Sequence, residues 1–224
     1  MHFNAYNRQL TIKEIESNAH RQFVGGLWHE IGLLQYDFLL SKGLEPRNSL
    51  LDLGCGALRG GIHLVRYLDS GKYRGVDSNA SLLKAGQIEL KKARLEKKRP
   101  TLIQEDQFRQ ESLGKGYDFA ISISLFTHLP QYLIKQCLKG VSSALSPSGV
   151  YFASFFEVPE DNRESLVIHS PGNITTHSAK DPFHQSKGEL RKLAGEGGLD
   201  MVYIGDWKHP RAQRIASFKR RSTY

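Results

Sequence analysis

The sequence predicts an α/β protein with a doubly wound, seven-stranded, mostly parallel sheet and an antiparallel last strand. Short apolar runs alternate with segments of helical periodicity over residues 47–156, and a glycine-rich loop follows the first run. Parallel strands need long crossovers, so this alternation indicates βαβ units with helices on both faces. The connection between the last two runs, residues 207–212, is too short for a crossover, so that pair must be antiparallel.

Length and composition limit the class of protein. The chain has 224 residues, 39% of them hydrophobic, which suits one compact domain, or a domain with one added cap. No window approaches 18 consecutive apolar residues, so we expect no membrane span, and the first residues show no signal-peptide core. Two cysteines, Cys55 and Cys137, are too few for a disulfide framework or a zinc site. We therefore expect a cytoplasmic protein without a metal.

Residues 1–45 are expected to form an N-terminal helical cap, with the main domain over residues 46–224. Thr11 and Glu14 form a capping box, and Gly43 ends the helical pattern. Within the cap, an apolar stripe recurs at helical spacing at Leu27, Ile31, Leu34 and Phe38.

The main domain divides into regular elements. Helical stripes are expected over residues 58–68, 83–93 and 134–145, and a capping box at Ser186 and Glu189 starts a further short helix. A turn is expected at residues 146–149. The expected strands are residues 49–53, 73–77, 101–104, 117–124, 150–156, 200–206 and 213–219.

Residues 157–185 fit no regular element. This long polar segment contains three prolines and three histidines. Structureless segments of this length inside a domain are usually lids or binding loops, so we expect a lid or an acceptor-binding insertion.

The strongest chemical signal is the glycine-rich loop at residues 51–61, between the first strand and the first helix of the sheet. Glycines allow close approach of a ligand, and the helix N-terminus offers N–H groups to an anion. Arg59 stands where the dinucleotide fingerprint needs its third glycine, which argues against a nicotinamide-dependent oxidoreductase. Asp52 would repel pyrophosphate but suits an ammonium group, so an amino-acid-like ligand fits the loop.

Two later acidic residues indicate the remaining groups of the ligand. Asp77 ends the second strand, where an acid can accept hydrogen bonds from ribose hydroxyls. Asp106 follows the third strand and can accept from an exocyclic amine, with Phe108 near a flat base. Amino acid, ribose and adenine together indicate S-adenosylmethionine, with S-adenosylhomocysteine as the product.

These motifs resemble those of class I S-adenosylmethionine-dependent methyltransferases. Leu51–Gly56 resembles the first motif, Gly75–Asp77 the ribose motif, Glu105–Phe108 the adenine motif, and Phe119–Leu129 the fourth strand with its loop. Leu58 replaces a glycine that is frequent in the first motif, so the path of the loop is open. Residues 205–213 are similar to a hairpin in a bacterial subgroup with small or unassigned acceptors. The resemblance implies a methyltransferase with a Rossmann-like fold.

The carboxyl ends of the strands define the expected site residues. The expected acceptor-binding residues are Trp28, Tyr36, Phe156, Trp207 and Arg211. The expected cofactor contacts are Asp52, Gly54, Cys55, Gly56, Arg59, Asp77, Ser78, Asp106, Gln107 and Ser124.

Three histidines are candidate general bases, which are needed only if the acceptor must lose a proton. His128 follows the fourth strand directly and is the first choice, while His184 and His209 lie on the insertion and the hairpin. Metal-dependent relatives usually carry an acid at the position of Ser124, which supports a metal-free reaction.

We expect methyl transfer to an oxygen or nitrogen atom of a small molecule, but other functions stay open. The formal net charge of +8 comes largely from two stripes: residues 91–99 carry six basic side chains and one acid, and residues 208–224 carry six basic side chains and no acid. Such stripes could attract RNA or an acidic protein as a methyl acceptor. A binding module without catalysis is a further alternative. The acceptor and the oligomeric state are not identified by the sequence.

Overall fold

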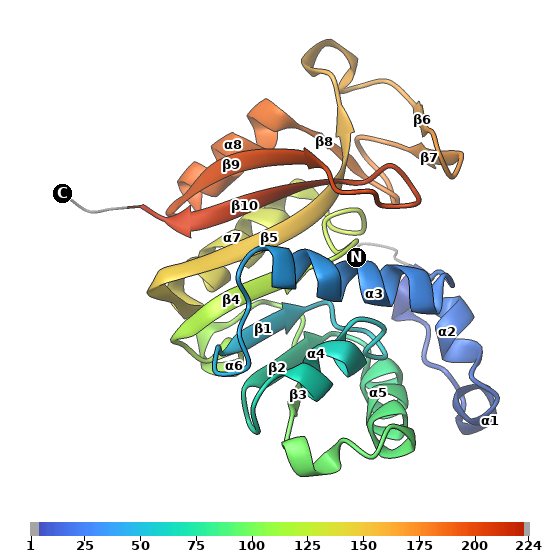
Figure 1. Ribbon diagram of the computed structural model, residues 1–224. Helices are drawn as coiled ribbons and strands as arrows, with labels where there is room; N and C mark the ends of the chain where they lie inside the picture. Colours follow the sequence, from blue (N-terminus) through green and yellow to red (C-terminus); the bar gives the residue numbers. More distant parts are fainter. Residues whose placement is uncertain (1–4, 222–224) are drawn as a thin grey trace. The chain divides into compact units, whose positions relative to one another are not determined.

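The computed structural model describes residues 5–221 (Figure 1). Contacts divide the chain after Asp106 into two compact units, Met1–Asp106 and Gln107–Tyr224. The seven expected strands are all present, three in the first unit and four in the second. The boundary expected near residue 45 stays a prediction.

The first unit contains a parallel sheet in the order β3-β2-β1. Leu53 lies opposite Val76, and Asp77 lies opposite Gln104, so the carboxyl ends of the three strands are aligned. All four side chains of the first strand are buried, as expected for a strand covered on both faces. The bounds are β1 Leu50–Leu53, β2 Tyr73–Asp77 and β3 Thr101–Gln104, which confirms the predicted strands.

The N-terminal residues are less continuous than the periodicity suggested. Asn18 and Leu27 adopt left-handed backbone conformations (φ 64° and 47°), so the segment breaks into short helices. The predicted stripe was wrong at Leu27, which caps a helix and is 41% exposed. The elements are η1 Ala5–Asn7, α1 Ile12–Glu16, α2 Ala19–Phe23 and α3 Trp28–Ser41, and the capping box of Thr11 and Glu14 is confirmed.

Two longer connections in the first unit also form helices. Leu58 lies in the loop with φ 68°, so α4 spans Gly61–Tyr67 and starts later than the predicted stripe. Helix α5, Ala80–Lys92, begins at Asn79, whose side chain accepts hydrogen bonds from the backbone of Ser81 and Leu82. A short 3-10 helix, η2 Glu96–Lys98, precedes β3.

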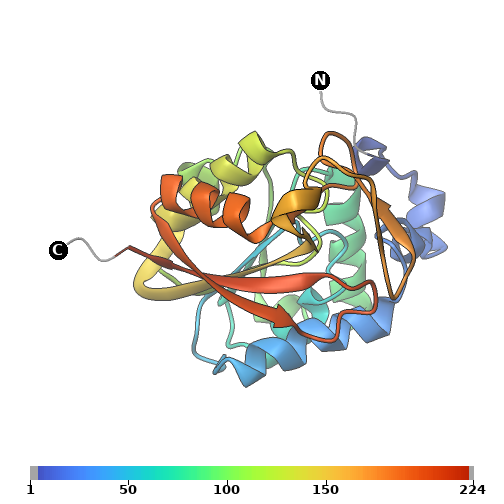
Figure 2. The same ribbon diagram turned by 90° about the horizontal axis from the view of Figure 1, so that it is seen from above.

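The second unit contains four strands in the order β4-β5-β10-β9, and β8 (His184–Ser186) lies beside the end of β5. The first pair is parallel, whereas β10 runs antiparallel to both its neighbours, as predicted. Figure 2 shows α7 and α8 side by side in this unit. The bounds are β4 Tyr117–Ser122, β5 Leu145–Val158, β9 Leu199–Asp206, β10 Arg214–Arg220, α6 Gln110–Leu113, α7 Gln131–Ala144 and α8 Lys187–Glu196.

The turn expected at residues 146–149 lies within the bounds of β5. Pairing with β4 shifts between Tyr117 and Phe119, which marks a bulge at this point. A Cβ atom on Gly149 would lie 2.4 Å from the carbonyl oxygen of Tyr117, so only glycine permits this close approach.

The insertion at residues 157–185 is structured, which corrects the expectation that it fits no element. Its first part contains η3 Glu160–Asn162, followed by an antiparallel hairpin of β6 Val167–His169 and β7 Ile174–Thr176. Its last part enters β8 His184–Ser186, which pairs in parallel with β5, placing Phe156 opposite His184. The insertion therefore leaves from β5 and returns to it (Figure 1).

Buried aromatic rings fill the core of the second unit. Phe126, Tyr151 and Phe218 are fully buried, and their ring centroids lie 5.4–6.5 Å apart. Within residues 5–221, no helix has the length and apolar character needed to cross a membrane.

Candidate active site

The glycine loop is held against the end of β2. The backbone N–H groups of Gly54 and Cys55 donate to the carbonyl oxygen of Val76 at 2.8 and 3.1 Å. Gly54 and Gly56 have φ angles of 69° and 53°, a region that favours glycine. The loop is therefore a compact turn that presents its backbone after the carboxyl end of β1.

Asp77 joins this loop to the start of α5. Its Oδ2 accepts the N–H of Gly56 at 2.8 Å, and its Oδ1 accepts the N–H of Asn79 at 2.8 Å. Burial raises the pKa of this carboxyl, against the opposing effect of the two hydrogen bonds. Each oxygen has a second lone pair, so Asp77 can also accept hydrogen bonds from a ribose.

Asp52 precedes the loop and is more deeply buried than the sequence suggested. It is 5% exposed, and the hydroxyl of Tyr73 donates to its Oδ2 at 2.6 Å. Burial raises the pKa of Asp52 to about 7; the Tyr73 hydrogen bond opposes this shift, and the charge of Asp77 adds to it. A cationic partner would favour the charged form of this carboxyl, so the residue fits an ammonium group.

Cys55 lies within the loop and is buried. Burial, followed by the charges of Asp77 and Asp52, raises the pKa of its thiol well above the usual value. The thiol therefore stays protonated and does not act as a nucleophile, which leaves it as a small side chain inside the turn.

Arg59 anchors the N-terminal segment. Its guanidinium donates to the carbonyl oxygens of Val24 and Gly26 at 3.0 and 3.1 Å. The residue that breaks the dinucleotide fingerprint therefore fixes the turn before α3. Its predicted contact with the cofactor stays a prediction.

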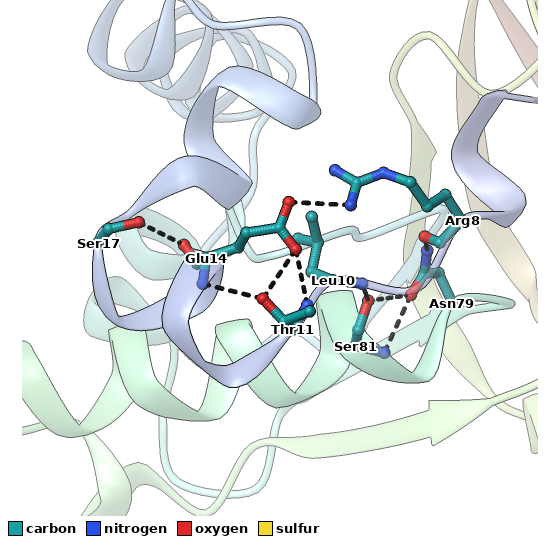
Figure 3. A network of polar contacts seen from close by, with 7 residues as sticks. All are labelled: Arg8, Leu10, Thr11, Glu14, Ser17, Asn79 and Ser81. Carbon is teal, nitrogen blue, oxygen red and sulfur yellow. Dashed lines mark hydrogen bonds and ion pairs between the residues drawn. The ribbon is translucent and has the colours of Figure 1, made fainter.

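The N-terminal segment crosses the start of α5 at Asn79 and Ser81 (Figure 3). Ser78, which precedes Asn79 in the chain, is exposed. The amide of Asn79 donates to the carbonyl oxygens of Tyr6 and Arg8 at 2.7 and 2.9 Å. The N–H of Leu10 donates to the hydroxyl of Ser81 at 2.8 Å. These bonds fix the segment beside the residue expected to bind ribose.

Trp28 and Tyr36 make packing contacts within the first unit. The guanidinium of Arg21 lies 5.0 Å from the ring centroid of Trp28, which also packs against a buried cluster that includes Ala57 of the glycine loop. The ring of Tyr36 contacts His63 and Tyr67. Both side chains are half-buried, and their roles toward an acceptor stay predictions.

The expected adenine motif is largely exposed. Asp106 and Gln107 lie on the surface, whereas the neighbouring Glu105 is buried and its N–H donates to the carbonyl oxygen of Asp77 at 3.0 Å. Phe108 is buried, and its backbone lies against Gly140 of α7. The exposed carboxylate of Asp106 is therefore the better candidate for an amine.

Ser124 belongs to a polar network at the end of β4. Its N–H donates to the hydroxyl of Ser154 at 2.7 Å, and its hydroxyl lies 3.1 Å from Oε1 and 3.0 Å from Nε2 of Gln213. The hydroxyl of Ser154 donates to the same amide oxygen at 2.7 Å. This network fixes the left-handed backbone at Ser124, where φ is 63°.

The three histidines expected as bases have different environments. The Nδ1 atom of His128 lies 2.6 Å from Oδ1 of Asp181, and both side chains are partly exposed. His209 is buried, stacks on Trp207, and accepts the N–H of Arg211 at its Nδ1. His128 has a carboxylate at its Nδ1, an arrangement that orients a catalytic histidine.

His184 is 3% exposed, and both its ring nitrogens are engaged. Its Nδ1 lies 2.8 Å from the hydroxyl of Thr176, and its Nε2 lies 2.9 Å from the carbonyl oxygen of Arg163. This geometry does not support a role for His184 in taking a proton from a substrate.

A pocket of about 530 Å³ opens in the second unit beyond the end of β5. The insertion and the start of β10 form its walls. Its lining residues are Glu157, Val158, Pro159, Glu160, Ile168, His169, Ser170, Lys187, Ala212 and Arg214.

Of the expected acceptor residues, Phe156 and Arg211 adjoin this pocket but do not line it. Phe156 packs its ring on His169 at 4.6 Å, and the backbone of Arg211 lies against Gly172. His169, Lys187 and Arg214 do line it, and sequence reasoning did not single them out. His169 and Lys187 follow β5 in the chain, and Arg214 is the first residue of β10. These positions are the sequence signal that could have indicated them.

The architecture and the strand-end residues define the class I methyltransferase fold, and comparisons with known proteins agree. Residues 51–151 match the methyltransferase domain family. Residues 51–151 are thus a methyltransferase domain, which supports a methyltransferase activity with S-adenosylmethionine as the methyl donor.

Solved structures show the same fold at low sequence identity. A methyltransferase from Clostridium acetobutylicum is 12% identical with a TM-score of 0.68, covering 95% of this chain and 100% of that chain. The magnesium protoporphyrin IX methyltransferase from Synechocystis with bound S-adenosylmethionine is 16% identical with a TM-score of 0.61, covering 96% and 88%. The CcbJ methyltransferase from Streptomyces caelestis is 13% identical with a TM-score of 0.63, covering 87% and 90%.

Proposed function

We propose that the protein transfers a methyl group to an oxygen or nitrogen atom of a small molecule that binds in the pocket of the second unit. The pocket carries this proposal, because its volume of about 530 Å³ is in the range of small-molecule sites. Six of its ten lining residues are polar or charged, so the pocket suits a polar small molecule.

The first unit supplies most of the proposed cofactor contacts. The glycine loop with Asp52 suits the zwitterionic methionine end, and Asp77 with Ser78 suits the ribose. Asp106 and Gln107 suit the adenine, with Arg59 and Ser124 as further contacts. The cofactor supplies an activated methyl group when it is bound, so the protein mainly aligns the acceptor, excludes water and removes a proton.

His128 is the proposed general base, and Asp181 orients it. A proton on Nδ1 makes the hydrogen bond to the Asp181 carboxylate, which places the lone pair of the neutral ring on Nε2. Nε2 then takes the proton that the acceptor loses, and Asp181 stabilises the resulting imidazolium. An acceptor that is already a free amine needs no such step.

A matched pair of variants tests the pocket. Purified protein is assayed with a panel of small hydroxyl and amine compounds, with S-adenosylhomocysteine as the measured product. Ile168 lines the pocket and Val202 lies on β9 outside it, and both are 63% exposed. Ile168→Trp should lower kcat/KM at least tenfold, whereas Val202→Trp should leave it unchanged. Equal rates in both variants would contradict the proposed acceptor site.

A polymer acceptor is the alternative outcome. The basic residues at 91–99 lie at the end of α5 and in η2, and most of them are exposed. If RNA or protein is methylated instead, binding should weaken steeply with salt and Ile168→Trp should have little effect. A cytoplasmic location stays a prediction, in agreement with two buried cysteines that are both free.

A further inference from the structure

A chain of hydrogen bonds fixes the protonation of the histidines behind the pocket. It starts at the carbonyl oxygen of Arg163, which can only accept and lies 2.9 Å from Nε2 of His184. Nε2 therefore carries a proton, and a ring with this single proton accepts at Nδ1. The hydroxyl of Thr176 lies 2.8 Å from that Nδ1 and donates to it.

The same logic continues to His169. Thr176 has one hydroxyl proton. Its contact with His184 at 2.8 Å is much shorter than its contact with the carbonyl oxygen of Val167 at 3.5 Å, so we assign the proton to His184, and the oxygen accepts from the next partner. That partner is Nε2 of His169, at 2.8 Å. His169 is thus held as the tautomer with a proton on Nε2 and a lone pair on Nδ1. His169 lines the pocket and is 8% exposed.

The surroundings keep His169 neutral. Burial is the largest cause that lowers its pKa to about 4, and the positive charge of Arg214 acts in the same direction. The ring of Phe156, centred 4.6 Å away, fixes the plane of the imidazole. A neutral ring with a fixed tautomer is a directional hydrogen-bond acceptor.

The charged side chains of the pocket differ in what they can still bind. Glu157 accepts from the Tyr203 hydroxyl and lies 3.4 Å from Lys187, and Glu160 accepts the N–H of Gly188 at 2.6 Å. Arg214 meets carboxylates only at 3.3 and 3.8 Å within residues 5–221, beyond good hydrogen-bond length. The carboxylates are therefore occupied, whereas the guanidinium keeps donors for a ligand oxygen.

We propose that His169 is the residue that selects the acceptor, and that the pocket takes a hydroxy compound with a carbonyl or carboxylate oxygen. A ligand hydroxyl other than the methylated group donates to Nδ1 of His169, and the carbonyl or carboxylate oxygen of the ligand accepts from Arg214. Thr176 and His184 act as positioning residues that hold the tautomer. This inference rests on the proposed small-molecule function and names its substrate class.

The tautomer can be measured without any acceptor. In protein labelled with ¹⁵N-histidine, long-range NMR correlations at pH 7 should show His169 with its proton on Nε2. Thr176→Val should produce a mixture of tautomers at His169, and Thr176→Ser should restore the single form. An imidazolium, a proton on Nδ1, or an unchanged tautomer in a folded Thr176→Val protein would overturn the proposal.

Two matched probes test the ligand class. Titration with 4-hydroxybenzoate should shift the Nδ1 resonance of His169, whereas 4-methoxybenzoate, which lacks the donor, should not. His169→Asn keeps an acceptor oxygen near Nδ1 and should bind 4-hydroxybenzoate at least tenfold more tightly than His169→Ala. Equal shifts with both probes, or none with either, would overturn the proposal. S-adenosylhomocysteine binding and turnover are measured separately, so a failure of the methyltransferase function would be recognised independently.

Discussion

His128 and Asp181 form a hydrogen-bonded pair in which Nδ1 lies 2.6 Å from Oδ1, although 53 positions separate them in the chain. The pair joins the loop after β4 to the end of the insertion. A backbone bond from the N–H of Phe183 to the carbonyl oxygen of Thr127, at 2.7 Å, holds the two segments together. A carboxylate on Nδ1 orients the ring and stabilises its protonated form, as general-base catalysis requires.

We predict that His128→Ala lowers kcat by about 10²–10⁴-fold with an acceptor that must lose a proton. Asp181→Asn should lower it less, by roughly 10–100-fold, because the ring remains but loses its charged partner. Initial rates of S-adenosylhomocysteine formation measure both effects. Asp161→Asn, an exposed acid on the same insertion, is the control and should be neutral. A normal kcat in His128→Ala would remove this residue from the reaction.

Asp52 should make the stability of the cofactor-free protein depend on pH. A folded-state pKa near 7 lies above the ordinary value of 3.8, so the folded chain holds an extra proton between these values. Its stabilising contribution is fully present below about pH 4 and is lost as the pH rises through 7. Asp52→Asn should remove this dependence, and at pH 8 it should be more stable than the wild type by on the order of 2 kcal/mol.

Urea unfolding at pH 4 and pH 8 measures this difference, with the exposed Asp37→Asn as the control. The same Asp52→Asn variant should bind S-adenosylhomocysteine at least tenfold more weakly at pH 8, because an amide cannot pair with the ammonium group. Calorimetry showing wild-type affinity would argue against the proposed contact.

Glu89 holds the N-terminal segment through buried charge. It lies 2.8 Å from Nε2 of His20, which is fully buried, and Arg21 donates to both its oxygens at 3.0 and 2.9 Å. Burial alone would raise its pKa, but the bonds from His20 and Arg21 outweigh burial and lower the pKa to about 2. This contribution is present above about pH 4.5 and is lost as the pH falls toward 2.

We predict that Glu89→Ala lowers the free energy of unfolding by about 3–5 kcal/mol at pH 7, because it leaves a buried ion pair broken. The exposed Glu16→Ala should change it by less than about 0.5 kcal/mol. Urea denaturation of both variants decides the matter, and equal midpoints would contradict the prediction.

Arg59 offers a test of how the cofactor loop and the N-terminal segment are coupled. The lysine ammonium lies one bond closer to the backbone than Nη1 of Arg59, so Arg59→Lys should weaken the bonds to Val24 and Gly26 and loosen residues 24–27. Amide hydrogen exchange there should accelerate about tenfold, which corresponds to a lost charged hydrogen bond. Arg66→Lys on α4 is the exposed control. Unchanged exchange in Arg59→Lys would show that the turn is held by other contacts.

Local patterns in the sequence were sufficient for much of the fold. Strands β2 and β3 have the predicted bounds, and both capping boxes are present, because each depends on neighbouring residues. Leu58 shows the limit: it fits the helical stripe and is fully buried, yet it lies in the loop. The turn of the glycine loop, which continues past Gly56, overrides the periodicity.

The insertion and the pocket could not be derived in this way. The strands of the insertion have three residues each, too few to show the alternation of side chains that is typical of a strand. Their register depends on distant partners such as Phe156 opposite His184. His169 acquires its distinct chemistry only through Thr176 and His184, which the hairpin and β8 bring to it. The cofactor residues lie in local motifs, whereas the pocket residues gain meaning only in the folded chain.

The parallel pairing of β8 with the end of β5 has an evolutionary consequence. Both ends of the intervening loop are secured to one strand, so its length and side chains can diverge without disturbing the framework that carries the methyl donor. New substrates can thus be acquired by substitutions at about two dozen positions of this loop, while the residues that bind the methyl donor are kept.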